Sequence, residues 1–176
     1  MTVKTQICPV RSDSPCIKCN NSWSAGMHTS CADVCPEYAA WRGKTVYLAG
    51  AIAHVTPDFA TSWRRDATER LTAAGYTVLD PTQGKDLHAP GVNETVYTPK
   101  EIVEADLDMI RRADIVLAEV SKKDVPYHGT SMELVYARMW GKRIIVWGGS
   151  KSYWVRYHSE RVFLTLHEAL DYLEGR

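Results

Sequence analysis

A chain of 176 residues is long enough for one domain with a sizeable hydrophobic core and an appendage. It carries 21 basic and 21 acidic residues, and this neutral balance argues against binding to nucleic-acid polymers, which normally requires a clear basic excess. The longest apolar stretch, residues 46–53, is far too short to span a bilayer, and the first residues, MTVKTQ, lack the pattern of a signal peptide. We therefore expect a cytoplasmic protein with reduced thiols and no membrane association.

Residues 1–43 differ in composition from the rest of the chain, because they hold all five cysteines and no sustained apolar period. Two close cysteine pairs suit a tetrahedral Zn²⁺ ion, with the ligands Cys16, Cys19, Cys31 and Cys35. Cys8 would then be spare or would replace one of them. An iron–sulfur cluster and a set of unconnected thiols are the alternatives. Since so polar a segment can hardly fold without a staple, we predict a structural zinc knuckle in residues 1–43, beside a catalytic domain in residues 44–176.

Strand-like and helix-like patterns alternate after residue 43. They predict strands at 45–49, 77–79, 115–118, 144–147 and 162–164. Helices are predicted at 57–74, from the capping box at 98–101, from 129 to about 140, and from the capping box at 165–168 to near the end of the chain. A long polar loop is expected at 82–97. The strands are continuous apolar runs, which are typical of a parallel sheet covered on both faces. The expected fold class is α/β, a Rossmann/flavodoxin-like three-layer sandwich with a five-stranded parallel sheet.

Ligands of such folds bind beyond the carboxyl ends of the strands, here the segments 50–57, 80–97, 119–129 and 148–158. The turn that starts at Gly50 and includes Ile52 lies where a phosphate-binding turn would be, although it lacks the spacing of a dinucleotide fingerprint. Arg64 and Arg65 could reach a phosphate, but arginines on the polar face of a helix are usually only solvated.

Glu133 is the most informative candidate residue. Its place in Gly129-Thr130-Ser131-Met132-Glu133 predicts a carboxylate in the first turn of a helix, where the helix dipole favours the anion by ~0.3–1 kcal/mol. An ionised carboxylate at the mouth of a pocket suits nucleophilic attack on the anomeric carbon of a sugar. The plainer alternative is that Glu133 only complements the helix dipole.

Two further side chains point to the same chemistry. Asp106 borders the apolar face of its helix between Val103 and Ile110, so it could bind a sugar hydroxyl or pass a proton to a leaving base. Tyr47 lies in the first strand, and its hydroxyl could hold a neighbouring carboxylate in place. A solvated helix charge and an ordinary strand aromatic are the respective alternatives.

From about Lys44 to its end, the chain resembles the nucleoside 2-deoxyribosyltransferase family and its nucleotide N-glycosidase relatives. The matching pieces, in the family's order, are VYLAG (46–50), the Trp63-Arg64 helix, GYTVLDP (75–81), ADLDMIRRADIVLAEV (105–120), GTSMELVYA (129–137) and GKRIIV (141–146). Each piece alone is weak, whereas the ordered set is fairly specific and covers about three quarters of the chain.

The resemblance implies a nucleophilic role for Glu133, an orienting role for Tyr47, and substrate contact with protonation of the departing base for Asp106. It implies a double displacement through a glycosyl-enzyme ester, after which a free base accepts the sugar in transferases and water accepts it in hydrolases. Further substrate-binding candidates are Gly50, Trp63, Asp80, Gly129 and Thr130 in the matching segments, and Ile52 in the turn after the first strand. The resemblance also implies a small nucleoside or nucleotide as ligand, no catalytic cofactor, and a homodimer or higher homo-oligomer.

Two features depart from the family pattern. Many of the transferases carry an aspartate six residues before the nucleophile, and nucleotide hydrolases can carry a phosphate-binding serine there, but this chain has Tyr127. Asp124 is the candidate to substitute for that residue. His158, in the last loop expected at the site, is a further candidate for substrate contact. The cysteine-rich segment is the second departure.

Two readings from other functional classes remain open at this point. One is a nucleotide-binding module that senses its ligand without turning it over, while the cysteine segment contacts a partner protein. The other is a nucleic-acid-binding zinc protein, which the neutral charge balance disfavours.

Overall fold

The computed structural model describes residues 44–85, 87 and 97–175. The cysteine-rich segment, with the expected zinc ligands Cys16, Cys19, Cys31 and Cys35, lies outside the described residues. The elements in chain order are β1 (Thr45–Ala49), α3 (Pro57–Ala73), β2 (Thr77–Leu79), α5 (Pro99–Arg112), β3 (Ile115–Glu119), α6 (His128–Met139), β4 (Arg143–Trp147), α7 (Tyr153–His158), β5 (Arg161–Phe163) and α8 (Leu166–Glu174).

The five strands form one sheet in the order β2-β1-β3-β4-β5, and every neighbouring pair is parallel. This is the strand order of flavodoxin-like folds, so the predicted fold class is confirmed. The chain passes from β2 on one side of β1 to β3 on the other side. The carboxyl ends of β1 and β3 therefore flank the topological switch point, where ligands of open α/β sheets bind.

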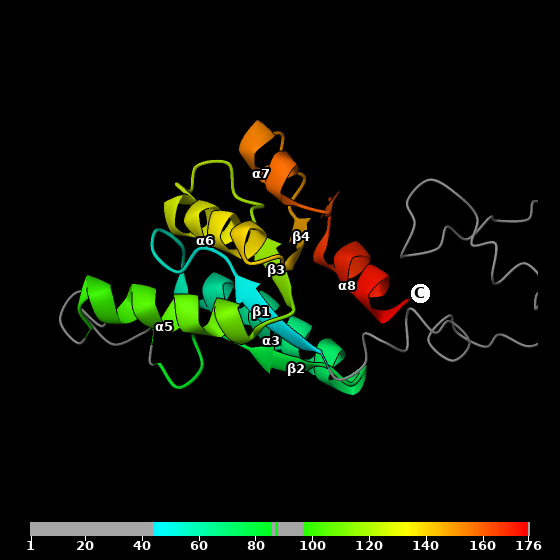
Figure 1. Ribbon diagram of the computed structural model, residues 1–176, viewed down its shortest axis with the longest axis horizontal. Coiled ribbons are helices and arrows are strands. Elements are labelled where there is room, and N and C mark those ends of the chain that lie inside the picture. Colours follow the sequence, from blue (N-terminus) through cyan, green and yellow to red (C-terminus); the bar gives the residue numbers. More distant parts are fainter. Residues whose placement is uncertain (1–43, 86, 88–96, 176) are drawn as a thin grey trace, which may run out of the picture.

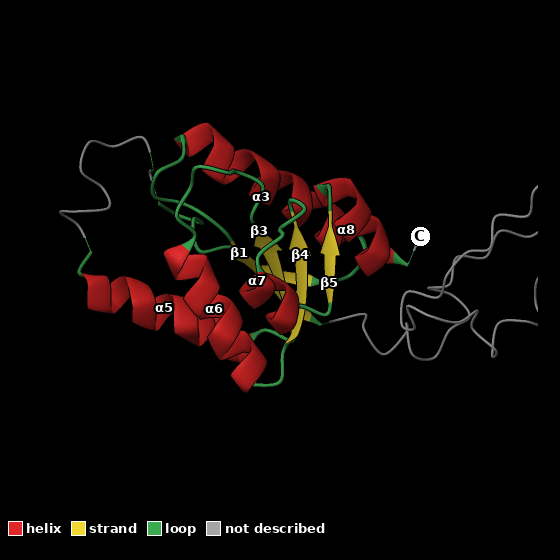
Figure 2. Cartoon of the chain, turned by 90° about the horizontal axis from the view of Figure 1, so that it is seen from above, coloured by secondary structure: helices red, strands yellow, loops and turns green. Residues whose placement is uncertain are grey.

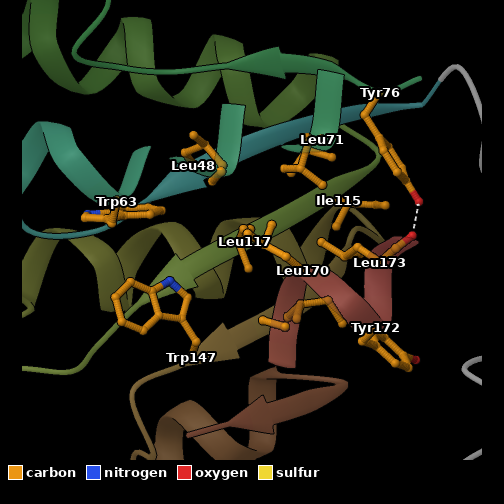
Figure 3. Close-up of a cluster of buried hydrophobic side chains, with 14 residues drawn as sticks. Leu48, Trp63, Leu71, Tyr76, Ile115, Leu117, Trp147, Leu170, Tyr172 and Leu173 are labelled. Atoms are coloured by element: carbon orange, nitrogen blue, oxygen red, sulfur yellow. Dashed lines mark hydrogen bonds between the residues drawn. The ribbon is translucent and has the colours of Figure 1, made fainter. Parts of the chain in front are cut away.

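The sheet lies between two helical layers, with α3 and α8 on one face and α5, α6 and α7 on the other (Figures 1 and 2). A hydrophobic core lies between the sheet and each layer. Side chains that alternate along each strand supply both cores, because successive residues of a strand point to opposite faces. Val46 and Leu48 pack with residues of α3 and α8 on one face, and Trp63 meets Trp147 edge to face in that layer (Figure 3). Tyr47 and Ala49 belong to the opposite core, with residues of α5, α6 and α7.

Local signals in the sequence explain where most helices begin. Thr56, Thr98 and Thr165 cap α3, α5 and α8 through their side-chain oxygens, and the two predicted capping boxes are present at α5 and α8. Helix α6 begins without a side-chain cap, at His128 rather than at Gly129.

Helix α7 is an element that the sequence did not predict. It has six residues, of which Val155 and His158 are buried and Tyr153, Trp154 and Tyr157 are exposed. An aromatic-rich segment that exposes three large rings has no recognisable apolar stripe, so the sequence indicated a loop.

Among the described residues, no helix is long and apolar enough to cross a membrane, and no group of three or more His, Cys, Asp or Glu could hold a metal ion.

Candidate active site

Tyr47 and Glu133 meet at the carboxyl-terminal edge of the sheet. Tyr47 is the third residue of β1 and points toward the α5–α6 layer, where its ring is fully buried. Its hydroxyl donates a hydrogen bond of 2.6 Å to Oε1 of Glu133 on α6. The sequence suggested that the Tyr47 hydroxyl could hold a neighbouring carboxylate, and in the structure this carboxylate is that of Glu133.

The surroundings of Glu133 raise its pKa to about 7. Burial is the largest cause, and the negative charge of Asp106 adds to it; the hydrogen bond from Tyr47 and the positive charge of Arg64 act in the opposite direction. Because α6 begins at His128, Glu133 lies in its second turn, and the prediction of a first-turn carboxylate is wrong. The helix dipole acts mainly within the first turn, so the tyrosine and the arginine are the groups that favour the anion.

Tyr47 remains a hydrogen-bond donor over the whole range in which proteins work. Burial, followed by the negative charges of Glu133 and Asp106, raises its pKa well above the usual value for a phenol. A permanently protonated hydroxyl fixes the orientation of the Glu133 carboxyl and favours its ionised form.

Asp106, on α5, presents a second carboxyl group to this edge. Its Oδ1 atom is buried, and none of the described residues donates a hydrogen bond to it. Burial raises the pKa of Asp106, while the positive charges of Lys85 and Arg64 lower it. A buried carboxyl oxygen without a partner is costly in a folded protein and is explained if a ligand supplies the missing polar group.

Arg64 is a component of the site that the sequence analysis set aside as solvated, and that expectation is wrong. The side chain is 0% exposed, although it comes from α3 on the other side of the sheet. Its Nη2 atom donates a hydrogen bond of 2.8 Å to the carbonyl oxygen of Gly50, in the turn after β1. The site is therefore enclosed from both helical layers.

Gly50 leaves no space for a side chain. A Cβ atom there would lie 2.9 Å from a ring carbon of Trp63 and 3.0 Å from Cβ of Glu119. We expect Gly50→Ala to lower the free energy of unfolding by about 2 kcal/mol, because overfilling a packed interior forces neighbours to shift.

Chemical denaturation of both proteins measures this effect, and Gly129→Ala is the matched control. A Cβ at Gly129 would meet no atom within 4 Å, so this variant should be as stable as the parent. Equal stability of Gly50→Ala and Gly129→Ala would refute the close packing around Gly50.

The remaining candidates near this edge occupy varied positions. Ile52 is half-buried in the turn after β1, Gly129 is exposed in the first turn of α6, and Thr130 beside it is buried. Asp80 follows β2 and accepts hydrogen bonds from both the backbone and the hydroxyl of Thr82. Its carboxylate also lies 3.6 Å from Nε of Arg64, so it is engaged with protein groups.

Trp63 and His158 are both buried. Trp63 packs against Trp147 in the core on the α3–α8 side, and its ring also lies against Gly50 in the turn after β1 (Figure 3). His158 is the last residue of α7, three residues before β5. The backbone N–H of Glu160 donates a hydrogen bond to the carbonyl oxygen of Ile144, near the start of β4. Helix α7 has therefore carried the chain back toward the amino-terminal edge of the sheet, and the structure does not place His158 beside Tyr47 and Glu133.

The loop between β3 and α6 is held by Glu119, a residue that the sequence analysis missed. Its buried carboxylate accepts hydrogen bonds through Oε1 from the Ser121 backbone, the Ser121 hydroxyl and the Tyr127 hydroxyl. The Tyr127 hydroxyl also accepts a bond from the backbone of Lys122, while Asp124 lies in an exposed turn. An acidic residue closing the apolar strand Ile115–Glu119 was the signal available in the sequence.

The protein is an α/β protein whose parallel sheet has the flavodoxin strand order. At the switch point of the sheet, Glu133 is bound by Tyr47 and Asp106 has a buried carboxyl oxygen, which is the arrangement of a small-molecule site. Residues 46–164 match the family model of nucleoside 2-deoxyribosyltransferase, and the chain belongs to this family.

Solved structures share the fold. A 2-deoxyribosyltransferase from Bacillus psychrosaccharolyticus is 18% identical with a TM-score of 0.54, over 72% of this chain and 90% of that one. The CMP N-glycosidase of Clostridium botulinum is 21% identical with a TM-score of 0.53, over 74% and 98%. A conserved protein from Enterococcus faecalis V583 is 11% identical with a TM-score of 0.56, over 75% and 98%. No curated protein matches the sequence.

Proposed function

We propose that this protein cleaves the N-glycosidic bond of a 2′-deoxynucleoside or its 5′-monophosphate and passes the sugar to another base or to water. The observation that carries the proposal is the 2.6 Å hydrogen bond between Tyr47 and Glu133 at the switch point of the sheet. Membership of the nucleoside 2-deoxyribosyltransferase family supports the class of reaction.

In the first half of the reaction, a carboxylate oxygen of Glu133 attacks C1′ of the sugar. The bond from C1′ to the base nitrogen breaks, its electron pair leaves with the base, and a sugar–Glu133 ester forms. In the second half, a nitrogen of a second base or a water oxygen attacks C1′ and releases the Glu133 carboxylate. The incoming water or base loses one proton in this step, and the Asp106 carboxylate, which gave its proton to the departing base, takes it up.

The environments of the two carboxyl groups support different roles. Glu133 is held by a phenol that donates a hydrogen bond, which favours the ionised form that a nucleophile needs. Asp106 has a buried oxygen to which no described residue donates, and burial raises its pKa. The unpartnered, buried oxygen of Asp106 beside Glu133 can hold a proton for the departing base, so we assign Asp106 the role of general acid.

The two outcomes, transfer and hydrolysis, differ only in what reaches the ester. We favour transfer slightly, and hydrolysis of a nucleoside 5′-monophosphate is the alternative. Tyr127 stands where related enzymes carry an aspartate or a phosphate-binding serine, and its hydroxyl is occupied by Glu119 and Lys122. Recognition of the base or phosphate must therefore use other groups.

The test is chromatography of the full-length protein incubated with deoxynucleosides and their 5′-monophosphates, each with and without a second free base. A new nucleoside that forms only when the second base is present would identify a transferase. Free base and free sugar in both conditions would identify a hydrolase. Intact substrates throughout, with ligand binding measured by calorimetry on folded protein, would replace the proposal with a nucleotide-binding module.

We also propose that the protein is at least a dimer and that the segment before residue 44 carries a zinc ion. Exposed rings of Tyr153, Trp154 and Tyr157 on α7 suit a contact between subunits, where aromatic residues are enriched. Light scattering should give a multiple of the chain mass, and elemental analysis should give about one zinc per chain. A monomer, or metal-free folded protein, would contradict the respective proposal.

A further inference from the structure

Arg64 is the only buried lysine or arginine among the residues that the structure describes. Burying a cation is costly unless several groups compensate for it. Two carbonyl oxygens do so here: Nη1 donates to Ala60 on the same helix, and Nη2 donates to Gly50 in the turn after β1. The carboxylate of Asp80 lies 3.6 Å from Nε, which has no hydrogen-bond partner in the described part of the chain.

The Arg64 guanidinium lies near the same end of β1 as the carboxyl groups that we propose to react. The guanidinium reaches the end of β1 from the α3 side, and Tyr47 and Glu133 meet near that end on the α6 side. Its positive charge acts electrostatically on Glu133 and Asp106. Asp80 and the two backbone carbonyls hold the charge in this place.

We propose that Arg64 is a positioning residue for the reaction: it fixes the turn at Gly50 beside the site, and its positive charge favours the carboxylate form of Glu133. The inference rests on the proposed function of Glu133 as nucleophile. The arginine itself makes no contact with the reacting atoms in this role.

The charged and titratable groups around Glu133 come from several elements. Tyr47 faces it from β1, Asp106 from α5 and Arg64 from α3, while Lys85, in the segment after β2, acts on Asp106. Arginine keeps its proton in proteins, so the effect of Arg64 is the same at every working pH. Removing its charge should therefore shift the titration of Glu133 without adding a new titrating group.

The experiment compares three variants of the full chain. Arg64→Gln keeps a hydrogen-bond donor but removes the charge, Arg64→Lys keeps the charge, and Arg65→Gln is the control, since the neighbouring Arg65 side chain is 77% exposed. The carboxyl carbon of Glu133 is followed by NMR in glutamate-labelled protein, with Glu133→Gln assigning the signal. The acid limb of kcat/KM is measured in parallel.

We expect Arg64→Gln to raise the pKa of Glu133, and to move the fall of kcat/KM at low pH to higher pH by the same amount. Arg64→Lys and Arg65→Gln should titrate as the parent does. A folded Arg64→Gln variant with an unchanged Glu133 titration would overturn the proposal. If Arg64→Gln does not fold, Arg64→Lys decides, because a raised Glu133 pKa in that folded variant would contradict a role based on charge.

The two proposals fail in distinguishable ways. If Arg64→Gln shifts the Glu133 titration but no nucleoside is cleaved by the parent protein, the proposed reaction is wrong while the electrostatic link between the two residues stands. If nucleosides are cleaved and the titration does not move, the reaction stands and the role of Arg64 is wrong.

Discussion

Replacing Glu133 with glutamine is expected to reduce the release of base from a deoxynucleoside by at least about 10³-fold. Glutamine has nearly the same shape and can still accept the hydrogen bond from Tyr47, but its amide cannot form the ester with C1′. The measurement is single-turnover base release, with substrate binding determined separately. Binding should persist, because the change removes the nucleophile and leaves the rest of the site in place.

Glu104→Gln provides the matched control for this variant. Glu104 lies on α5 with an exposed side chain that pairs only loosely with Lys100, at 3.9 Å. The control should retain the activity of the parent. If Glu133→Gln remained active, the nucleophile would have to be another carboxylate, and Glu119 and Asp106 would be the next to replace.

The second large effect concerns pH. The pKa of Glu133 is about 7, and only its ionised form can attack the sugar. We expect kcat/KM to fall about tenfold for each unit of pH below 7, as Glu133 takes up a proton. A profile of kcat/KM between pH 5 and 9 measures this limb. An acid limb near pH 4 to 5 would show that Glu133 is not held in the environment described.

Stability measured over the same pH range separates titration of the site from unfolding. The folded-state pKa of Glu133 lies above the ordinary value of 4.5, so the folded protein binds this proton more tightly than the unfolded chain does. This residue therefore makes folding less favourable as the pH rises from 4.5 through 7. Glu133→Gln should be more stable than the parent at pH 8, and the difference should disappear near pH 4.5.

Much of the fold could be predicted because the sequence carries independent local signals for it. Continuous apolar runs mark β1 and β3, and the capping boxes at Thr98 and Thr165 mark two helix starts. The pairing of Tyr47 with Glu133 could be predicted from the family resemblance, whereas the strand pattern alone indicated only that Tyr47 could hold a neighbouring carboxylate.

Arg64 shows why part of the site could not be predicted. Its position in α3, four residues after Ala60 and three before Ala67, belongs to the buried stripe of the helix. Periodicity therefore contained the signal, but a charged side chain is rarely buried, and its partners, the Gly50 carbonyl and Asp80, come from distant segments. The hydrogen bonds of Glu119 to Ser121 and Tyr127 could not be predicted for a different reason, because they depend on the path of an irregular loop.

The placement of the reacting groups has a consequence for the whole molecule. Glu133 comes from α6, whereas the Arg64 guanidinium comes from α3 in the opposite layer and binds the Gly50 carbonyl after β1. Neither layer can separate from the strands without pulling this group of charges apart. The arrangement of Tyr47, Glu133 and Arg64 therefore requires both helical layers to be packed on the sheet.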